Sequence, residues 1–121
     1  MTTPSENAAA LGARWARQHL ALADAGRSEQ AAFVIDVLGD PGELLALGAG
    51  LTALARMSAR MLTPAPRAQA TARQLELGRL RDAAGDDVDA LRDWLRQAAA
   101  ETLAVARLAE PDPEARRRLL A

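Results

Sequence analysis

Short breaks of Gly, Asp, Ser and Pro divide this chain into segments as long as ordinary helices. The breaks lie at Gly26–Ser28, Gly39–Pro41, Thr63–Pro66, Gly85–Asp87 and Pro111–Pro113. Glycine commonly follows the last turn of a helix, Ser and Asp accept hydrogen bonds from free N–H groups at a helix start, and Pro suits the first turn. Between the breaks, the chain is rich in the strong helix formers Ala, Leu, Arg, Glu and Gln. Aromatic residues make up only 2% of the chain and β-branched residues are few, so the sequence predicts an all-α protein.

The same pattern predicts a compact bundle of about five helices plus a short C-terminal tail helix, forming a single helical domain over residues 1–121. The expected helices cover about residues 4–25, 28–38, 41–62, 68–84 and 88–109. We expect helix 41–62 to be central, with the first and fifth helices packed against it. Residues 63–67 are predicted to be a flexible joint and residues 110–121 a frayed tail, because prolines interrupt both segments.

The stretch Val37–Gly50 contains four of the eight glycines of the chain and could be either a phosphate-binding loop or a junction between helices. A Walker-type loop needs a lysine, and the chain contains none. We therefore interpret the stretch as a junction, in which Gly39 adopts a left-handed backbone and Asp40 caps the next helix. Gly48 and Gly50 then lie inside that helix, where each costs about 1 kcal/mol relative to Ala. We expect close approach of another helix backbone to offset this cost.

Helix 41–62 is apolar on more than one of its faces. A helix of this kind is either buried centrally or covered by a partner, and a domain this small has few bulky residues to wrap it. The predicted partner-binding residues are Leu44, Leu47, Leu51, Leu54, Met57 and Met61. The sequence therefore predicts a small non-enzymatic interaction or adaptor module that contacts itself or another protein through helix 41–62, with a homo-oligomer as the expected state.

The segment Arg14-Trp15-Ala16-Arg17-Gln18-His19 supports a different hypothesis. It resembles the R-x(4–6)-H motif of HEPN-type ribonucleases, which are also small helical proteins. The resemblance covers six residues and implies that His19 acts as an acid or base on a ribose hydroxyl while Arg14 holds the scissile phosphate. The family usually has a polar residue where this chain has Trp15, and its motif lies late in the fold rather than in the first helix. The alternative to catalysis is a structural His19, partly buried beside Trp15.

The arginines raise the possibility of a nucleic-acid-binding accessory subunit. They form three clusters along the chain: Arg56 with Arg60, Arg73 with Arg79 and Arg81, and Arg116–Arg118. The formal net charge is nevertheless −1, and no aromatic residues are interleaved with the arginines to stack on single strands. Nucleic acid is therefore not an expected partner, and the Arg and Ala bias is also typical of a high-GC genome.

No cofactor or metal is predicted. The chain has no Cys and one His, too few for a thiolate site or for the paired Glu-x-x-His motifs of a di-metal bundle. The acidic cluster Asp86, Asp87, Asp89 and Asp93 has the spacing of a capped helix start rather than that of a calcium loop. The uncharged apolar run Leu44–Ala55 is too short to span a membrane, and the N-terminal residues lack the order of a signal peptide. We expect a cytoplasmic protein without a membrane partner.

Overall fold

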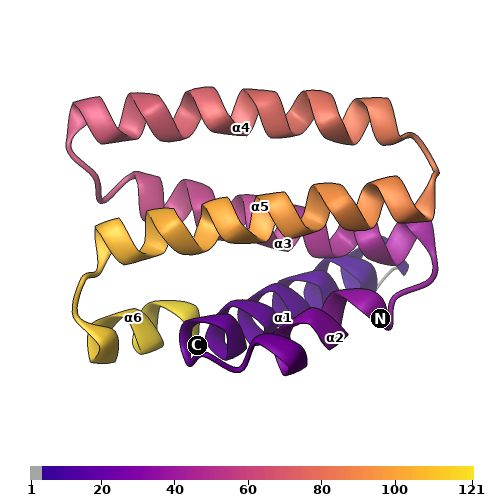
Figure 1. The fold of residues 1–121 in the computed structure, drawn as a ribbon, viewed down its shortest axis with the longest axis horizontal. Helices are drawn as coiled ribbons and strands as arrows, with labels where there is room; N and C mark the ends of the chain where they lie inside the picture. Colours follow the sequence, from indigo (N-terminus) through magenta and orange to yellow (C-terminus); the bar gives the residue numbers. More distant parts are fainter. Residues whose placement is uncertain (1–3) are drawn as a thin grey trace.

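The computed structural model describes residues 4–121, which form six α-helices and no strand (Figure 1). The helices are α1 (Pro4–Asp24), α2 (Ser28–Asp36), α3 (Pro41–Ala59), α4 (Pro64–Ala84), α5 (Val88–Ala109) and α6 (Pro113–Leu120). The paired helices α3 and α5 form a central layer, with α4 on one side and α1, α2 and α6 on the other (Figure 1). The predicted all-α bundle with a short C-terminal helix is confirmed.

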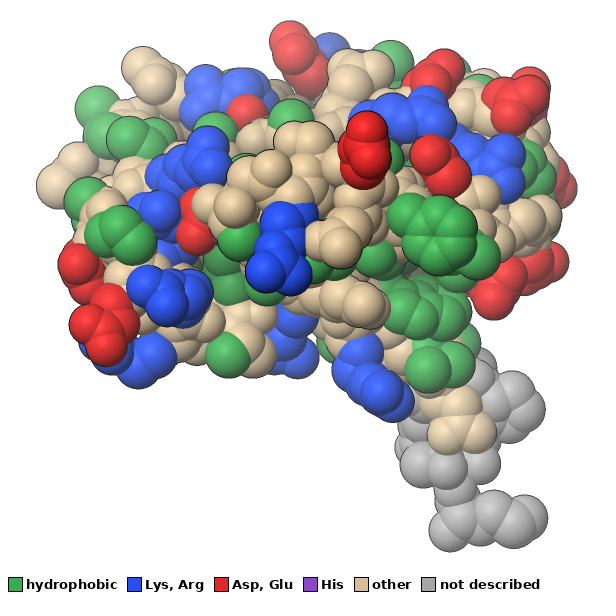
Figure 2. Space-filling view, turned by 60° about the horizontal axis from the view of Figure 1, so that its bottom comes forward, with side chains coloured by type: hydrophobic (Ala, Val, Ile, Leu, Met, Phe, Trp, Pro, Cys, Tyr) green, Lys and Arg blue, Asp and Glu red, His purple; other side chains and the backbone are tan. Residues whose placement is uncertain are grey.

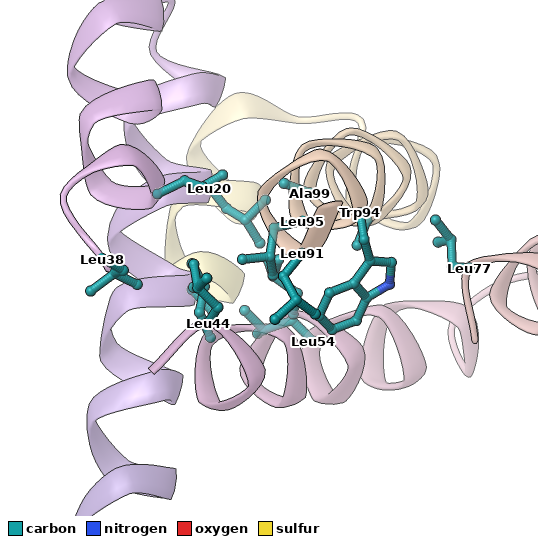
Figure 3. Close-up of a cluster of buried hydrophobic side chains, with 14 of the residues drawn as sticks. Leu20, Leu38, Leu44, Leu54, Leu77, Leu91, Trp94, Leu95 and Ala99 are labelled. Atoms are coloured by element: carbon teal, nitrogen blue, oxygen red, sulfur yellow. The ribbon is translucent and has the colours of Figure 1, made fainter. Parts of the chain in front are cut away.

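The core is built from the leucine stripe of α3 and the regular apolar stripe of α5. On α5, apolar residues recur three and four positions apart, so they share one face of the helix. Leu91, Trp94 and Leu95 on that face extend toward α3, where they meet Leu44 and Leu54, and Leu20 of α1 closes the cluster (Figure 3). This arrangement makes α3 the helix around which the others pack.

Helices α1 and α3 approach each other closely where both carry small residues. A Cβ atom placed on Gly50 would lie 2.5 Å from the carbonyl oxygen of Gly12 and 2.9 Å from the Cβ of Ala16. A Cβ on Gly12 would overlap the backbone carbonyl of Ala46. Gly50 thus lies against a helix backbone, as expected from the sequence, but its partner Gly12 was not expected. At Gly48, the neighbour is instead a side chain, the indole ring of Trp94.

The breaks at residues 37–41 and 85–88 are helix junctions. The Asp40 carboxylate accepts a hydrogen bond from the Glu43 N–H at 3.2 Å, and the Asp87 carboxylate accepts from two N–H groups of the first turn of α5. These caps confirm the junction interpretation of Val37–Gly50. The left-handed conformation predicted for Gly39 is wrong, because α2 already ends at Asp36 and Gly39 has no positive φ.

The predicted joint over residues 63–67 is corrected, because α4 begins at Pro64 rather than at Ala68. Prolines are tolerated here since N–H groups in the first turn of a helix have no acceptor within it. The Arg67 side chain also donates hydrogen bonds to three carbonyl groups at the end of α3, those of Ala59, Arg60 and Leu62. The connection between α3 and α4 is therefore a capped turn.

The prediction of a frayed tail is corrected as well, because residues 113–120 form α6, which packs against the rest of the bundle. Asp112 caps this helix, and the Leu120 side chain is buried in the core. The Arg116 guanidinium lies 2.9 Å from the Asp24 carboxylate of α1, and both side chains are largely buried. Burial alone would raise the pKa of Asp24, but hydrogen bonds and charge from Arg116 and Arg107 outweigh it and lower the pKa below 3.8.

The close approach of α1 and α3 predicts opposite effects for two Gly-to-Ala substitutions. Gly50→Ala should lower the free energy of unfolding by about 1 kcal/mol or more, because overpacking exceeds the gain in helix propensity. Gly78→Ala should raise it by up to about 1 kcal/mol, because a Cβ on this α4 residue meets no atom within 4 Å. Urea unfolding of the two variants measures both effects, and a Gly50→Ala protein more stable than wild type would contradict the packing.

The ion pair between α1 and α6 predicts that Asp24→Ala destabilises the fold by about 3 kcal/mol, because Arg116 loses its partner in a largely buried site. Glu114→Ala is the matched control in the same tail. Its pair with Arg118 is exposed and 4.0 Å long, so we expect a change of less than about 0.5 kcal/mol. Equal urea midpoints for the two variants would show that the tail does not depend on this pair.

Candidate docking groove

The structure places most of the predicted partner-binding stripe inside the chain's own core. Leu44, Leu47, Leu51 and Leu54 are buried, because α1 and α5 cover this side of α3. In this fold the four leucines have a core role instead of the predicted partner-binding one. Met57 and Met61 differ from them, since both side chains remain exposed.

The exposed side of α3 carries its own apolar ridge. It consists of residues spaced four apart: Leu45, Ala49, Ala53, Met57 and, just beyond the helix, Met61. Each of the five residues is exposed, and the ridge contains no charged residue. Ridges of residues four apart are the surfaces that fit into grooves of a neighbouring helix. The residues predicted from the sequence include Met57 and Met61 of this ridge but not Leu45, Ala49 and Ala53, because the larger leucines beside them dominate the pattern.

A groove lies between α3 and α4, above α5. It combines a cavity of about 530 Å³ with a second one of about 450 Å³ farther along α3, and the two share Thr52, Arg56, Arg81 and Trp94. The floor is apolar: the Trp94 indole extends from α5 toward α3, and Leu77 lies on the α4 side (Figure 3). The groove thus joins the apolar ridge of α3 to the core of the bundle.

The groove is open because small side chains border it and α4 is lightly packed. Gly48, Ala49 and Ala53 line it on α3, and Gly78 lines it on α4. Helix α4 packs mainly on α5, buries only Ala70 and Leu77, and is tied to α5 by the Arg73–Glu101 ion pair at 2.5 Å. Small residues cannot fill the space between α3 and α4, so the groove stays open above the nearly buried side chains of Trp94 and Leu77.

Positive charge predominates along the walls of the groove. Arg56 of α3 and Arg79 and Arg81 of α4 line it, against a single acidic residue, Asp82. The Arg81–Asp82 pair is 3.4 Å long and exposed, so it contributes little. Leu75, whose side chain is exposed to 64%, adds an apolar contact on the α4 wall. The groove is suited to a ligand that combines apolar surface with negative charge.

Arg14 and His19, the candidate nuclease pair, do not share an accessible surface. They lie five positions apart on α1, which places their side chains about 140° apart around the helix axis. Arg14 is exposed, whereas His19 is buried and its Nδ1 lies 2.7 Å from the Ala31 carbonyl oxygen of α2. Since that carbonyl can only accept, Nδ1 carries the proton. His19 therefore links α1 to α2 by a hydrogen bond. This agrees with the alternative of a structural, buried His19.

Neither a metal centre nor a membrane span is found among residues 4–121. No group of three or more His, Cys, Asp or Glu side chains within this range is arranged to hold a metal ion. No helix in this part of the chain is long and apolar enough to cross a bilayer.

The environment of His19 predicts a pH-dependent stability. Burial lowers its pKa below 6.5, against the hydrogen bond to the Ala31 carbonyl, which raises it. The unfolded chain therefore takes up a proton first as the pH falls through 6.5, and the free energy of unfolding decreases below that pH. Asp24 does not contribute to this change in stability, because its pKa is lowered below 3.8 and its carboxylate stays charged over this pH range. When the pH is lowered from about 7.5 to about 5.5, the urea midpoint of wild type should fall, and that of His19→Gln should fall less. An equal fall of the midpoint in the two proteins would contradict a buried neutral His19.

Comparison of the chain with protein-family models, curated proteins and solved structures gives no match.

Proposed function

We propose that this chain is a small helical protein–protein interaction module of the cytoplasm that self-associates through helix 41–62, using the groove between α3 and α4. The observation that carries the proposal is an open groove with arginine walls, in which the apolar side chains of Leu45 and Leu75 are exposed. Grooves of this type accept the apolar face of a helix from a partner. The binding surface thus lies on the side of α3 away from the buried leucines.

Exposed apolar side chains around the groove support the proposal. Leu45, Met57 and Leu75 are partly or largely exposed, and covering each would contribute roughly 1 kcal/mol. Methionine adapts its shape to different partners and is common at such surfaces. Because association itself costs at least about 4 kcal/mol, a contact of this size is expected to be weak and strongly dependent on concentration.

The geometry favours binding over the two alternatives. A nuclease would need Arg14 and His19 on one accessible surface, whereas the His19 ring is packed between α1 and α2. A nucleic-acid interface would need accessible aromatic rings beside the arginines, and Trp94 in the groove is largely buried. We therefore propose neither activity for this chain.

Two matched leucine substitutions test the proposal. Leu75→Glu changes the groove wall, and Leu108→Glu changes a residue of α5 that lies outside the groove. The two side chains are exposed to 64% and 58%, so both variants should fold like wild type. Light scattering over micromolar to millimolar concentrations should show the mass of wild type and Leu108→Glu rising above 12.8 kDa, and that of Leu75→Glu remaining there.

Thermal unfolding provides a second measurement of the same property. Assembly linked to folding makes the thermal midpoint rise with protein concentration for wild type and Leu108→Glu but not for Leu75→Glu. A wild-type mass of 12.8 kDa at every concentration would contradict self-association. Equal behaviour of the two variants would contradict the assignment of the contact to the groove.

A further inference from the structure

Helix α2 presents the most exposed aromatic side chain of the described residues. Phe33 is exposed to 66% and Val37, one helical turn later, to 59%. The Val37 N–H donates to the Phe33 carbonyl at 3.0 Å, so the helical geometry continues and the two side chains lie on the same face. Figure 2 brings this side of the molecule forward and shows apolar side chains gathered near the start of α1. We call Glu29, Phe33, Asp36 and Val37 the α2 knob.

The α2 knob lies in an acidic part of the chain. From Ser28 to Glu43 the sequence contains four acidic residues and no basic one. Glu29 lies one turn before Phe33, on the same exposed face, so it adds a negative charge beside the aromatic ring. The knob therefore combines apolar surface with negative charge, the two properties that suit the groove.

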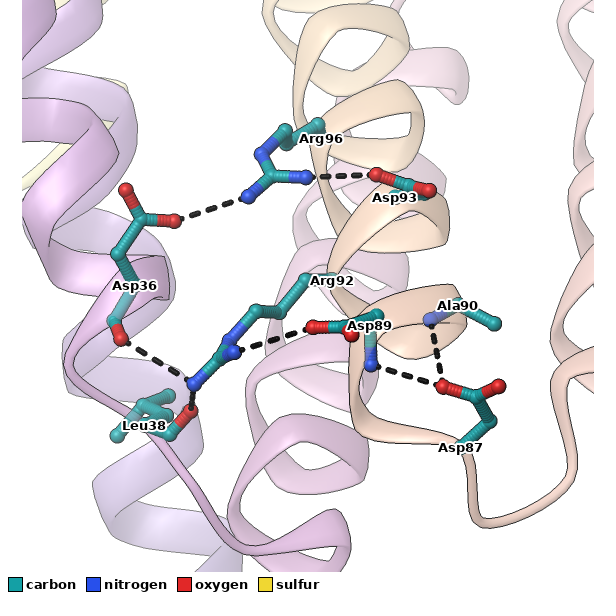
Figure 4. Close-up of polar contacts among 8 residues, drawn as sticks. All are labelled: Asp36, Leu38, Asp87, Asp89, Ala90, Arg92, Asp93 and Arg96. Carbon is teal, nitrogen blue, oxygen red and sulfur yellow. Dashed lines mark hydrogen bonds and ion pairs between the residues drawn. The ribbon is translucent and has the colours of Figure 1, made fainter.

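Two arginines of α5 hold the end of α2 in place (Figure 4). Arg92 donates hydrogen bonds to the carbonyl oxygens of Asp36 at 3.3 Å and of Leu38 at 2.8 Å. Arg96 donates to the Asp36 carboxylate at 3.0 Å and so offsets part of its charge. Since its C-terminal end is anchored, α2 presents Phe33 and Val37 on a fixed surface, and a preformed surface loses less entropy on binding.

The α2 knob and the groove lie on opposite sides of the molecule. Helix α2 packs on α1 and α5, whereas the groove is bordered by α4, and the α3–α5 layer separates the two (Figure 1). A contact between different surfaces of identical chains is heterologous, and it leaves a knob free at one end and a groove free at the other. Such a contact adds further copies until a ring closes or a filament forms.

We propose that the α2 knob of one copy occupies the groove between α3 and α4 of the next copy, which gives a head-to-tail assembly. The inference rests on the proposed function, because it names the occupant of the same groove. Phe33 and Val37 supply the apolar contact for the exposed side chains of Leu45 and Leu75 in the groove. Glu29, which is exposed, supplies negative charge for the arginine walls.

Complementation between two variants tests the head-to-tail contact. Phe33→Glu removes the knob and keeps the groove, whereas Leu75→Glu disrupts the groove and keeps the knob. Each variant alone should remain at 12.8 kDa in light scattering over micromolar to millimolar concentrations. An equimolar mixture should form a complex of two copies and grow no further, because one intact knob meets one intact groove. A control for unspecific effects of the new charge mixes Leu108→Glu with Phe33→Glu, or Leu108→Glu with Leu75→Glu. Leu108→Glu should form mixed complexes with both variants, because its knob and its groove are intact.

The outcomes separate the inference from the proposed function. If wild type assembles, Leu75→Glu does not, and Phe33→Glu still does, the groove is the binding surface but α2 is not its occupant. If the mixture of Phe33→Glu and Leu75→Glu remains at 12.8 kDa, the head-to-tail contact is overturned in the same way. A wild type that remains at 12.8 kDa at every concentration overturns both proposals.

Discussion

The close approach of α1 to α3 is the contact on which the remaining structure depends. Gly12 and Gly50 remove the side chains that would keep the two helix backbones apart. The approach covers one side of the α3 leucine stripe, and α5 covers the other. Glycine weakens a helix, so both positions lower local helix stability in exchange for packing. Once α1 and α5 are in place, the small residues on the opposite side of α3 remain at the surface and border the groove.

Local signals predicted the helices and most of their junctions correctly. Asp40 and Asp87 cap helices as expected, because a cap depends only on the residues of one turn. Signals of the same kind were misleading over residues 63–67, where the prolines begin a helix rather than form a joint. The final residues were misjudged for another reason, since the anchor of α6 is Asp24, far away in the sequence. Contacts between distant segments are not visible in a local pattern.

The proposed binding surface illustrates the same limit. The sequence indicated that α3 is apolar on more than one face, but the prediction assigned to a partner the leucine stripe that α1 and α5 cover. Helix α1 covers the leucine side of α3 because Gly12 allows its backbone to approach Ala46 closely, a contact that the sequence alone does not reveal. The buried state of His19 likewise depends on the Ala31 carbonyl of α2. A motif of two residues within one helix contains no information about the helix that covers it.

The light packing of α4 has a consequence for how this protein can change during evolution. Only Ala70 and Leu77 of α4 are buried, so most of its positions tolerate substitution without loss of the core. The same helix forms one wall of the groove. Most positions of this wall can therefore change while the core is kept. Mutations in α4 can therefore alter the shape and charge of this wall one residue at a time, while α1, α3 and α5 preserve the scaffold.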